Sequence, residues 1–305
     1  MLVALRVRWR GEQTRVVLPQ WACAELAAGL APSTDVEHEG AHHAPPIGEV
    51  NVQPGDDGPW AILRDGELAW RGADPAELQR RLVSEVHLSI AAHATSVVFI
   101  HAGVVAVPGG AVVVPGRSMS GKTTLVRELV ARGAQYLSDE YAVITAEGMV
   151  VPYSKPLSIR TDHGVDRVPG SSVGAVAGGP VPVRAVVHTC FEPGAAWSPE
   201  RGGGASVVMP LFDNAVAARV RPELVLDHTV AVARSGAVSY HGPRGEAAQT
   251  AELILDHLVL EPGACSRARA RECAPGSELG ACSRAREREC APGSELGGDG
   301  CGLLI

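Results

Sequence analysis

One short stretch limits what this chain can fold into. Residues 112–129 read VVVPGRSMSGKTTLVREL and match the pattern G-x-x-x-x-G-K-[ST], with Gly116, Gly121, Lys122 and Thr123 in the fixed places. In such a loop, glycines let backbone N–H groups point at phosphate oxygens, and the following helix contributes its positive end. A valine-rich strand before the motif and an amphipathic helix after it are the context that it requires. The stretch therefore predicts a strand–loop–helix unit that binds the phosphates of a nucleotide.

The side chains of the loop have separate expected roles. Lys122 reaches the β- and γ-phosphates, and the hydroxyl of Thr123 can bind Mg²⁺. The expected cofactors are therefore Mg²⁺ and a nucleoside triphosphate, and the motif does not separate ATP from GTP. The residues expected to contact the nucleotide are Gly116, Arg117, Ser118, Met119, Ser120, Gly121, Lys122, Thr123 and Thr124.

Two acids follow the loop at a spacing that returns them to it. Asp139 and Glu140 come 17 and 18 residues after Lys122. A helix of about 11 residues leads the chain roughly 16 Å away from the loop, and a strand of about five residues covers a similar distance back. We therefore expect Asp139 near the phosphates, where a carboxylate can bind Mg²⁺ or accept a proton from an attacking hydroxyl. A solvent-exposed strand end is the alternative.

His101 is a further candidate for the same site. It ends the apolar run VVFIH, and Pro108-Gly109-Gly110 predicts a turn, so residues 97–115 are expected to form a β-hairpin. Antiparallel pairing puts the start of the first strand beside the end of the second, where the phosphate loop begins. The hairpin therefore predicts His101 near the phosphates, and a purely structural histidine is the alternative.

Charge and hydropathy argue against several classes of protein. A net charge of −7 argues against a general nucleic-acid binder. The charged start MLVALRVRWRGEQ does not fit an ordinary secretory signal. Residues 86–116 lack Asp, Glu, Lys and Arg, and their length would allow a membrane helix. Because the run is valine-rich and interrupted by a turn, we expect strands, no membrane contact and a cytoplasmic location.

Three regions are expected along the chain. Residues 1–73 predict a small β-rich region, with a turn at Asp65-Gly66 and an irregular loop over residues 31–58. Residues 74–260 predict the phosphate-loop domain, and residues 261–305 a disordered tail. The tail holds two 17-residue copies, 264–280 and 281–297, which have too few apolar side chains to form a core. Within the second region the expected elements are helix 74–95, helix 122–132, strand 134–145, strand 183–191, helix 222–234 and helix 246–260.

Residues 100–143 resemble the catalytic core of the bacterial HPr kinase/phosphorylase family. The shared order is a strand ending in His, a hairpin, a phosphate loop, a helix ending in Arg-Gly, and a short strand ending in two acids. The resemblance implies an α/β (α+β) fold related to phosphoenolpyruvate carboxykinase, with a mixed sheet, and an ATP-dependent serine kinase. It places His101 at the family's active-site histidine, and Asp139 and Glu140 at its acid pair.

This sequence departs from the family in three places, one of which is its N-terminal region. The second acid is Glu140 rather than Asp, and Ser158 stands in the segment nearest to the family's signature glutamate. Residues 97–260 are more similar to shorter relatives, some of which phosphorylate a serine of a lasso or other ribosomally made peptide.

The leading hypothesis is an ATP-dependent phosphotransferase that acts on a serine of a protein or peptide. Asp139 or Glu140 takes the hydroxyl proton, His101 orients or charges that acid, and Lys122 stabilises the γ-phosphate. The alternatives are a non-catalytic nucleotide-binding module or slow NTPase switch, and a small-molecule kinase of the shikimate or gluconate type. A homo-oligomer is left open. Candidate arginines for the transition state are Arg160, Arg167, Arg184 and Arg219.

Overall fold

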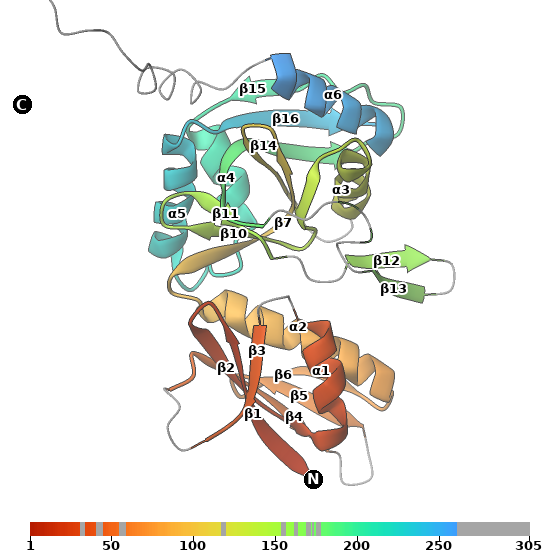
Figure 1. Ribbon diagram of the computed structural model, residues 1–305, viewed down its shortest axis with the longest axis vertical. Helices are drawn as coiled ribbons and strands as arrows, with labels where there is room; N and C mark the ends of the chain where they lie inside the picture. The colour runs from red at the N-terminus through yellow and green to blue at the C-terminus, as the bar shows by residue number, and fades with distance from the viewer. Residues whose placement is uncertain are drawn as a thin grey trace, which may run out of the picture. The chain divides into compact units, whose positions relative to one another are not determined.

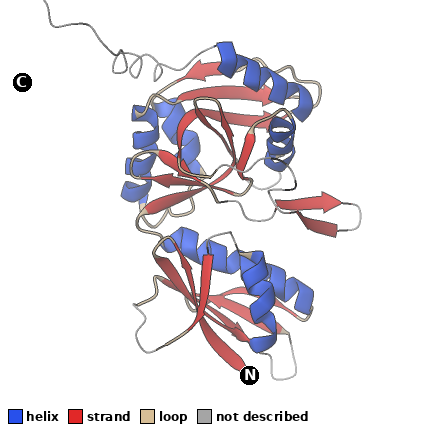
Figure 2. Ribbon diagram, in the orientation of Figure 1, coloured by secondary structure: helices blue, strands red, loops and turns tan. Residues whose placement is uncertain are grey.

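The computed structural model shows a mixed α/β protein, in which runs of strands are separated by helices (Figures 1 and 2). The predicted division at residues 73 and 260 stays a prediction, and the predicted tail lies outside the described residues. The structure describes residues 1–30, 34–40, 45–54, 59–116, 120–153, 157–161, 164–168, 172, 174 and 178–260.

Six of the described strands form an N-terminal sheet in the order β3-β1-β2-β4-β5-β6. They are β1 (Leu2–Trp9), β2 (Glu12–Pro19), β3 (Thr34–His38), β4 (Gly48–Gln53), β5 (Trp60–Arg64) and β6 (Glu67–Gly72). The predicted turn at Asp65-Gly66 is confirmed, and both residues have a positive φ. The prediction of an irregular loop over residues 31–58 is wrong. β3 and β4 lie within it because their backbones pair with β1 and β2, which local composition does not encode.

Helices α1 (Cys23–Gly29) and α2 (Pro75–His93) pack against this sheet. α2 begins as predicted, since the Asp74 carboxylate accepts the N–H of Ala76 at 2.9 Å and Pro75 takes the first helical position. Its residues Leu78, Leu82, Val86 and Ile90 repeat on one face and are buried in the core of the N-terminal sheet.

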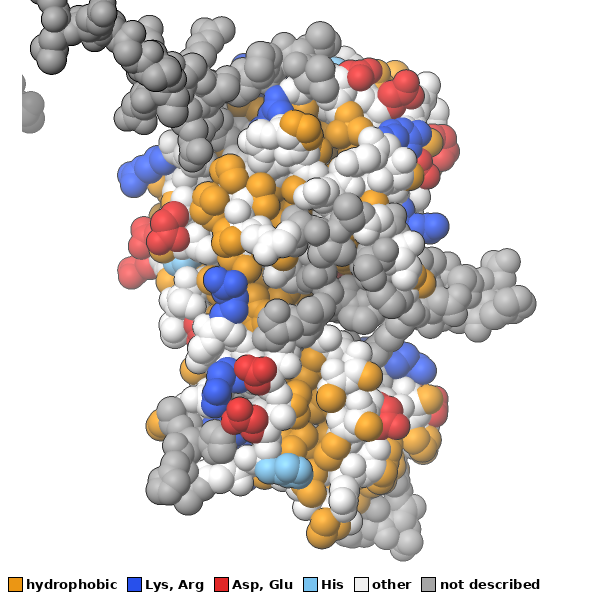
Figure 3. All heavy atoms as spheres, viewed as in Figure 1, with side chains coloured by type: hydrophobic (Ala, Val, Ile, Leu, Met, Phe, Trp, Pro, Cys, Tyr) orange, Lys and Arg blue, Asp and Glu red, His pale blue; other side chains and the backbone are white. Residues whose placement is uncertain are grey.

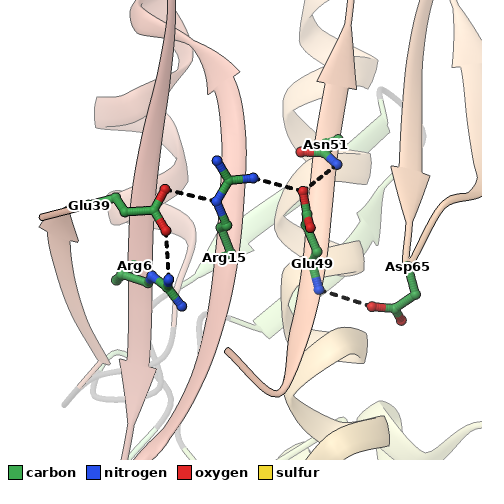
Figure 4. Close-up of polar contacts among 6 residues, drawn as sticks. All are labelled: Arg6, Arg15, Glu39, Glu49, Asn51 and Asp65. Atoms are coloured by element: carbon green, nitrogen blue, oxygen red, sulfur yellow. Dashed lines mark hydrogen bonds and ion pairs between the residues drawn. The ribbon is translucent and has the colours of Figure 1, made fainter. Parts of the chain in front are cut away.

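Ion pairs run across the strands of the same sheet (Figure 4). Glu39 accepts from Arg6 at 2.6 Å and from Arg15 at 2.8 Å, and Arg15 also donates to Glu49 at 2.8 Å. The hydrogen bond from Arg15 lowers the pKa of Glu39. On the face in Figure 3, the described basic and acidic side chains are interspersed rather than gathered into one basic surface.

A second sheet of eight described strands follows, in the order β11-β10-β7-β8-β14-β16-β15, with β9 beside β7. The strands are β7 (Val97–Val107), β8 (Gly110–Pro115), β9 (Gln135–Ser138), β10 (Tyr141–Thr145), β11 (Met149–Val151), β14 (Val181–Phe191), β15 (Glu200–Gly202) and β16 (Val238–Arg244). The sheet is mixed, as expected. A separate hairpin pairs β12 (Leu157–Thr161) with β13 (Gly164–Val168).

Two pairs of helices contribute to separate cores on this sheet. α3 (Lys122–Ala131) and α6 (Ala247–Leu260) bury Leu125 and Ile254 in one core, and α4 (Ala205–Asp213) and α5 (Pro222–Arg234) bury Leu211 and Val225 in the other. In the apolar run 86–116, residues 97–115 form the β7–β8 hairpin, as predicted. Within the described residues, no helix has both the length and the apolar character needed to cross a bilayer.

Candidate active site at the phosphate-binding loop

The phosphate-loop motif lies at the carboxyl ends of three parallel strands. β8 runs parallel to β14, and β14 runs parallel to β16, so the ends of the three strands meet at one edge of the sheet. Gly116 follows β8 directly, and α3 begins at Lys122. Ligands of open α/β sheets bind at such an edge. The strand–loop–helix order that the motif predicts is therefore present, with the loop at the edge where a ligand would bind.

The described ends of the loop are shaped by short contacts. Lys122 Nζ donates to the Gly116 carbonyl at 2.7 Å and lies 3.5 Å from Ser120 Oγ. A Cβ on Gly116 would lie 2.9 Å from Ser120 Oγ, so a larger residue here would force the serine hydroxyl to shift. Thr124 is exposed on the first turn of α3. The predicted contacts of Arg117, Ser118 and Met119 lie outside the described residues.

Asp139 lies beside the N-terminus of α3, where the spacing of helix and strand predicts it. Its Oδ2 accepts a hydrogen bond from Thr123 Oγ1 at 3.4 Å, and its Oδ1 accepts one from Tyr136 Oη at 3.3 Å. The residue is only 8% exposed. Burial, followed by the charge of Asp139, raises the pKa of Tyr136 far above its usual range, so the phenol stays protonated and donates. Two hydroxyl groups thus hold the carboxylate at the loop.

The single strand predicted over residues 134–145 is wrong, because two strands occupy it. β9 and β10 both pair antiparallel with β7, and Asp139 and Glu140 lie in the break between them. Ser138 Oγ accepts the backbone N–H groups of Glu140 and Tyr141, at 3.3 and 3.1 Å. Within the break, the Glu140 carbonyl still accepts the N–H of Ala102 on β7 at 3.1 Å. The break itself presents the two acids at the edge of the sheet.

His101 also reaches this edge through its backbone. Its carbonyl accepts the N–H of Gly116 at 3.1 Å, and its cross-strand partner is Tyr141. The imidazole packs against the Tyr141 ring, with centroids 5.0 Å apart. The hairpin therefore brings His101 next to the start of the loop, as predicted. Its action on the acid stays a prediction.

Burial changes the proton affinity of the loop lysine. It lowers the pKa of Lys122, and the nearby negative charge of Asp139 opposes that shift. An ammonium group in this position is stabilised when an anion binds next to it. The electrostatics of the loop therefore favour a negatively charged ligand.

The residues at the loop fit a magnesium ion bound together with phosphates. Thr123 Oγ1 and Asp139 Oδ2 lie side by side, and Mg²⁺ takes oxygen ligands, usually one or two carboxylates plus substrate phosphates. These two residues would hold the ion, and when bound it would supply positive charge to the phosphate oxygens. Thr123 and Asp139 are the two Mg²⁺ ligands that the sequence predicts.

Sequence reasoning missed two residues at this site. Tyr136 lies three residues before Asp139 in the same segment. That short spacing is the feature of the sequence that could have indicated a contact between them. Arg244 ends β16 and donates to the loop carbonyl of Gly121 at 3.2 Å, and no local pattern indicates it. Of the arginines proposed instead, Arg184 contacts the carbonyl of Pro108, at the turn of the β7–β8 hairpin and therefore at the opposite end of β8 from the loop. The side chains of Arg160 and Arg167 lie outside the described residues.

A cavity of about 390 Å³ lies among β14, β15, β16 and α4. His188 and His241 stack there with ring centroids 5.3 Å apart, and Met209 and Asp213 of α4 also line it. Ser239 lines the cavity too, and its buried Oγ has no hydrogen-bond partner in the part of the chain that the structure describes. Burial and the neighbouring His241 lower the pKa of His188, while Asp213 opposes the shift. The cavity offers space and an unused polar group to a second ligand.

Comparison with known proteins finds similarity to solved structures. No family model matches the sequence, and no curated protein matches it. Among solved structures, the chain is similar to the HPr(Ser) kinase/phosphatase from Coxiella burnetii, with 16% sequence identity and a TM-score of 0.29. The match covers 57% of this chain and 98% of that one. A TM-score this low does not establish a shared fold, so the functional argument rests on the chain's own residues.

Proposed function

We propose that this chain is an ATP-dependent phosphotransferase that transfers the γ-phosphoryl group to a serine hydroxyl of a protein or peptide. The observation that carries the proposal is the convergence of Lys122, Thr123 and Asp139 at the start of α3. Beside this lysine and threonine, an almost buried carboxylate that two hydroxyls hold can bind Mg²⁺ or accept a proton from an attacking hydroxyl, as phosphoryl transfer requires. The acceptor class comes from the sequence resemblance of residues 100–143.

Bonds and protons balance in the proposed reaction. The serine oxygen forms a bond to the γ-phosphorus while the bond from that phosphorus to the β–γ bridging oxygen breaks, and ADP leaves. The serine proton moves to the carboxylate of Asp139. Lys122 and the N-terminal N–H groups of α3 balance charge on the phosphate oxygens. Tyr136 and Thr123 hold the carboxylate in place through the hydrogen bonds described above.

Incubation with γ-phosphate-labelled ATP, Mg²⁺ and an arrayed library of serine-containing peptides tests the proposal. We expect label on peptide serine, found by mass spectrometry as phosphoserine. Label released only as inorganic phosphate would point to an NTPase, and label on a small-molecule hydroxyl would point to a metabolite kinase. Nucleotide binding without transfer or hydrolysis would contradict every kinase reading.

We further propose that the acceptor side chain binds in the cavity between α4 and β16. His188 lines this cavity and lies two residues beyond Val186, whose partner Val113 lies two residues before the end of β8, so the cavity reaches the level at which the loop begins. Met209 lines the cavity and is 53% exposed, so tryptophan at this position fills space without disturbing the core. We expect Met209→Trp to reduce peptide phosphorylation about tenfold or more, because a displaced acceptor loses its alignment. ADP affinity, measured by calorimetry, should stay at the wild-type value.

Leu226→Trp is the matched control, because Leu226 is 47% exposed on α5 and does not line the cavity. It should leave both transfer and ADP affinity unchanged. If Met209→Trp weakens ADP binding instead, the cavity holds the nucleoside, and the assignment of the acceptor is wrong.

A further inference from the structure

Arg244 forms a set of contacts beneath the phosphate loop that the proposed chemistry does not yet use. The residue ends β16 and is 3% exposed. Its Nη2 lies 3.2 Å from the Gly121 carbonyl and 3.5 Å from the Ser120 carbonyl, and its Nη1 donates to the Gly245 carbonyl at 3.0 Å. The guanidinium also packs against the Phe191 ring, 5.5 Å from its centroid. A strand about 120 residues downstream thus holds the end of the loop.

These contacts decide which way the loop amides point. The Ser120 carbonyl shares a peptide plane with the N–H of Gly121, and the Gly121 carbonyl shares one with the N–H of Lys122. In a trans peptide the C=O and the N–H point in opposite directions. When Arg244 draws the two carbonyls to one side, it turns the two N–H groups to the other, toward the position of a phosphate in such a loop.

Gly121 allows Arg244 to approach the loop closely. A Cβ at this position would lie 2.3 Å from Arg244 Nη2, and the residue has a φ of +79°. Its carbonyl also accepts the N–H of Leu125 at 3.1 Å, which starts the hydrogen bonding of α3. The positive φ therefore favours glycine at this position of the motif, and a Cβ here would force the guanidinium of Arg244 to shift.

Within the part of the chain that the structure describes, the charge of Arg244 lacks a direct counter-ion. Among the described residues its hydrogen-bond acceptors are backbone carbonyls, no carboxylate forms an ion pair with it, and Nε has no partner. Burial lowers the pKa of Arg244, and the charge of Glu246 opposes that shift. A buried cation without a paired anion is costly. A bound polyphosphate would bring negative charge close to it, on the other side of the loop peptides.

We propose that Arg244 is a positioning residue for a polyphosphate anion: it orients the amides of Gly121 and Lys122, and the bound phosphates balance its charge. The inference rests on the proposed function, because it takes the nucleotide phosphates as the ligand. It predicts that Arg244 raises the affinity of the folded protein for polyphosphate, in addition to packing in the core.

The test compares Arg244→Gln, Arg244→Lys and the control Arg132→Gln in the full-length protein. Arg132 is exposed at the other end of α3, where it pairs with Glu128. Calorimetry with sodium pyrophosphate and with ADP should show a loss of affinity of roughly 10- to 100-fold for Arg244→Gln, and none for the control. Arg244→Lys keeps the charge but lacks the planar fork that spans two carbonyls, so its affinity should be intermediate.

Thermal unfolding separates a positioning role from a structural one. Without ligand, Arg244→Gln should melt near or above the wild type, because an unpaired buried charge is gone, but pyrophosphate should no longer raise its melting temperature. In a transfer assay the KM for ATP should rise more than kcat falls.

A folded Arg244→Gln variant with wild-type affinity for pyrophosphate would overturn the inference. Failure of both Arg244 variants to fold would also overturn it, because the arginine would then stabilise the core. A wild type that binds neither pyrophosphate nor ADP would overturn it as well. A wild type that binds pyrophosphate through Arg244 but transfers no phosphate would leave the inference standing and contradict the proposed function instead.

Discussion

Asp139→Asn is expected to reduce phosphoryl transfer roughly 10²- to 10⁴-fold, because the amide cannot accept the serine proton. ADP without metal should bind with equal or higher affinity, since a negative charge near Lys122 is removed. In this variant Mg²⁺ should no longer strengthen ADP binding, because the carboxylate that would hold the ion is gone. Transfer of label to peptide, and calorimetry with and without Mg²⁺, measure the three effects.

Asp227→Asn serves as the matched control, because it removes the same charge from an exposed position on α5. It should leave transfer and binding unchanged. Glu140→Gln tests the other acid, and we expect a smaller loss of transfer. The Asp139 carboxylate accepts the Thr123 hydroxyl, whereas the backbone of Glu140 bonds to Ala102 and to Ser138. Full loss of transfer in Glu140→Gln, with activity kept in Asp139→Asn, would assign the base to Glu140.

Lys122→Met should lower ADP affinity on the order of 100-fold, since charge-assisted hydrogen bonds to phosphate are lost. Phosphoryl transfer should fall at least as far. Methionine keeps the apolar stem of the side chain, so the packing around the loop is preserved. At neutral pH the free energy of unfolding without ligand should change by no more than about 1 kcal/mol. Calorimetry and chemical denaturation give the two values.

The same variant has a pH signature. The pKa of Lys122 in the folded state is below the usual 10.5, so between these two values the unfolded chain binds more protons than the folded one. Stability of the wild type should therefore rise, relative to Lys122→Met, as pH increases through that window. ADP affinity of the wild type should fall over the same range, because the neutral amine no longer attracts phosphate.

Arg127→Met on the exposed face of α3 controls for the loss of one positive charge from the same helix. It should keep wild-type ADP affinity at neutral pH. A Lys122→Met variant that binds ADP as tightly as the wild type would mean that the loop does not hold phosphate.

The phosphate loop shows how far local sequence goes toward a site. Gly116, Gly121, Lys122 and Thr123 lie within eight residues, and glycine conformation and helix geometry act over that distance. The return of Asp139 to the loop follows from the lengths of one helix and one strand. His101 follows from the turn at Pro108-Gly109-Gly110, which sets the hairpin register.

Residues that reach the loop from distant strands had no comparable signal. Arg244 lies on β16, and its place beneath Gly121 depends on the parallel pairing of β8, β14 and β16. The break at Asp139 and Glu140 depends on how two strands share β7. β3 and β4 likewise owe their form to pairing with β1 and β2, although composition indicates a loop.

By itself the sequence determined the phosphate loop, the elements on either side of it and the positions of the acid and the histidine. These depend on backbone conformation, turn geometry and element length, which act between near neighbours in the chain. Only the tertiary structure decided which hydroxyls hold Asp139, which arginine supports Gly121 and where the cavity lies. Those contacts join residues from separate strands and helices, and they form because burial of apolar side chains fixes the order and register of the sheet.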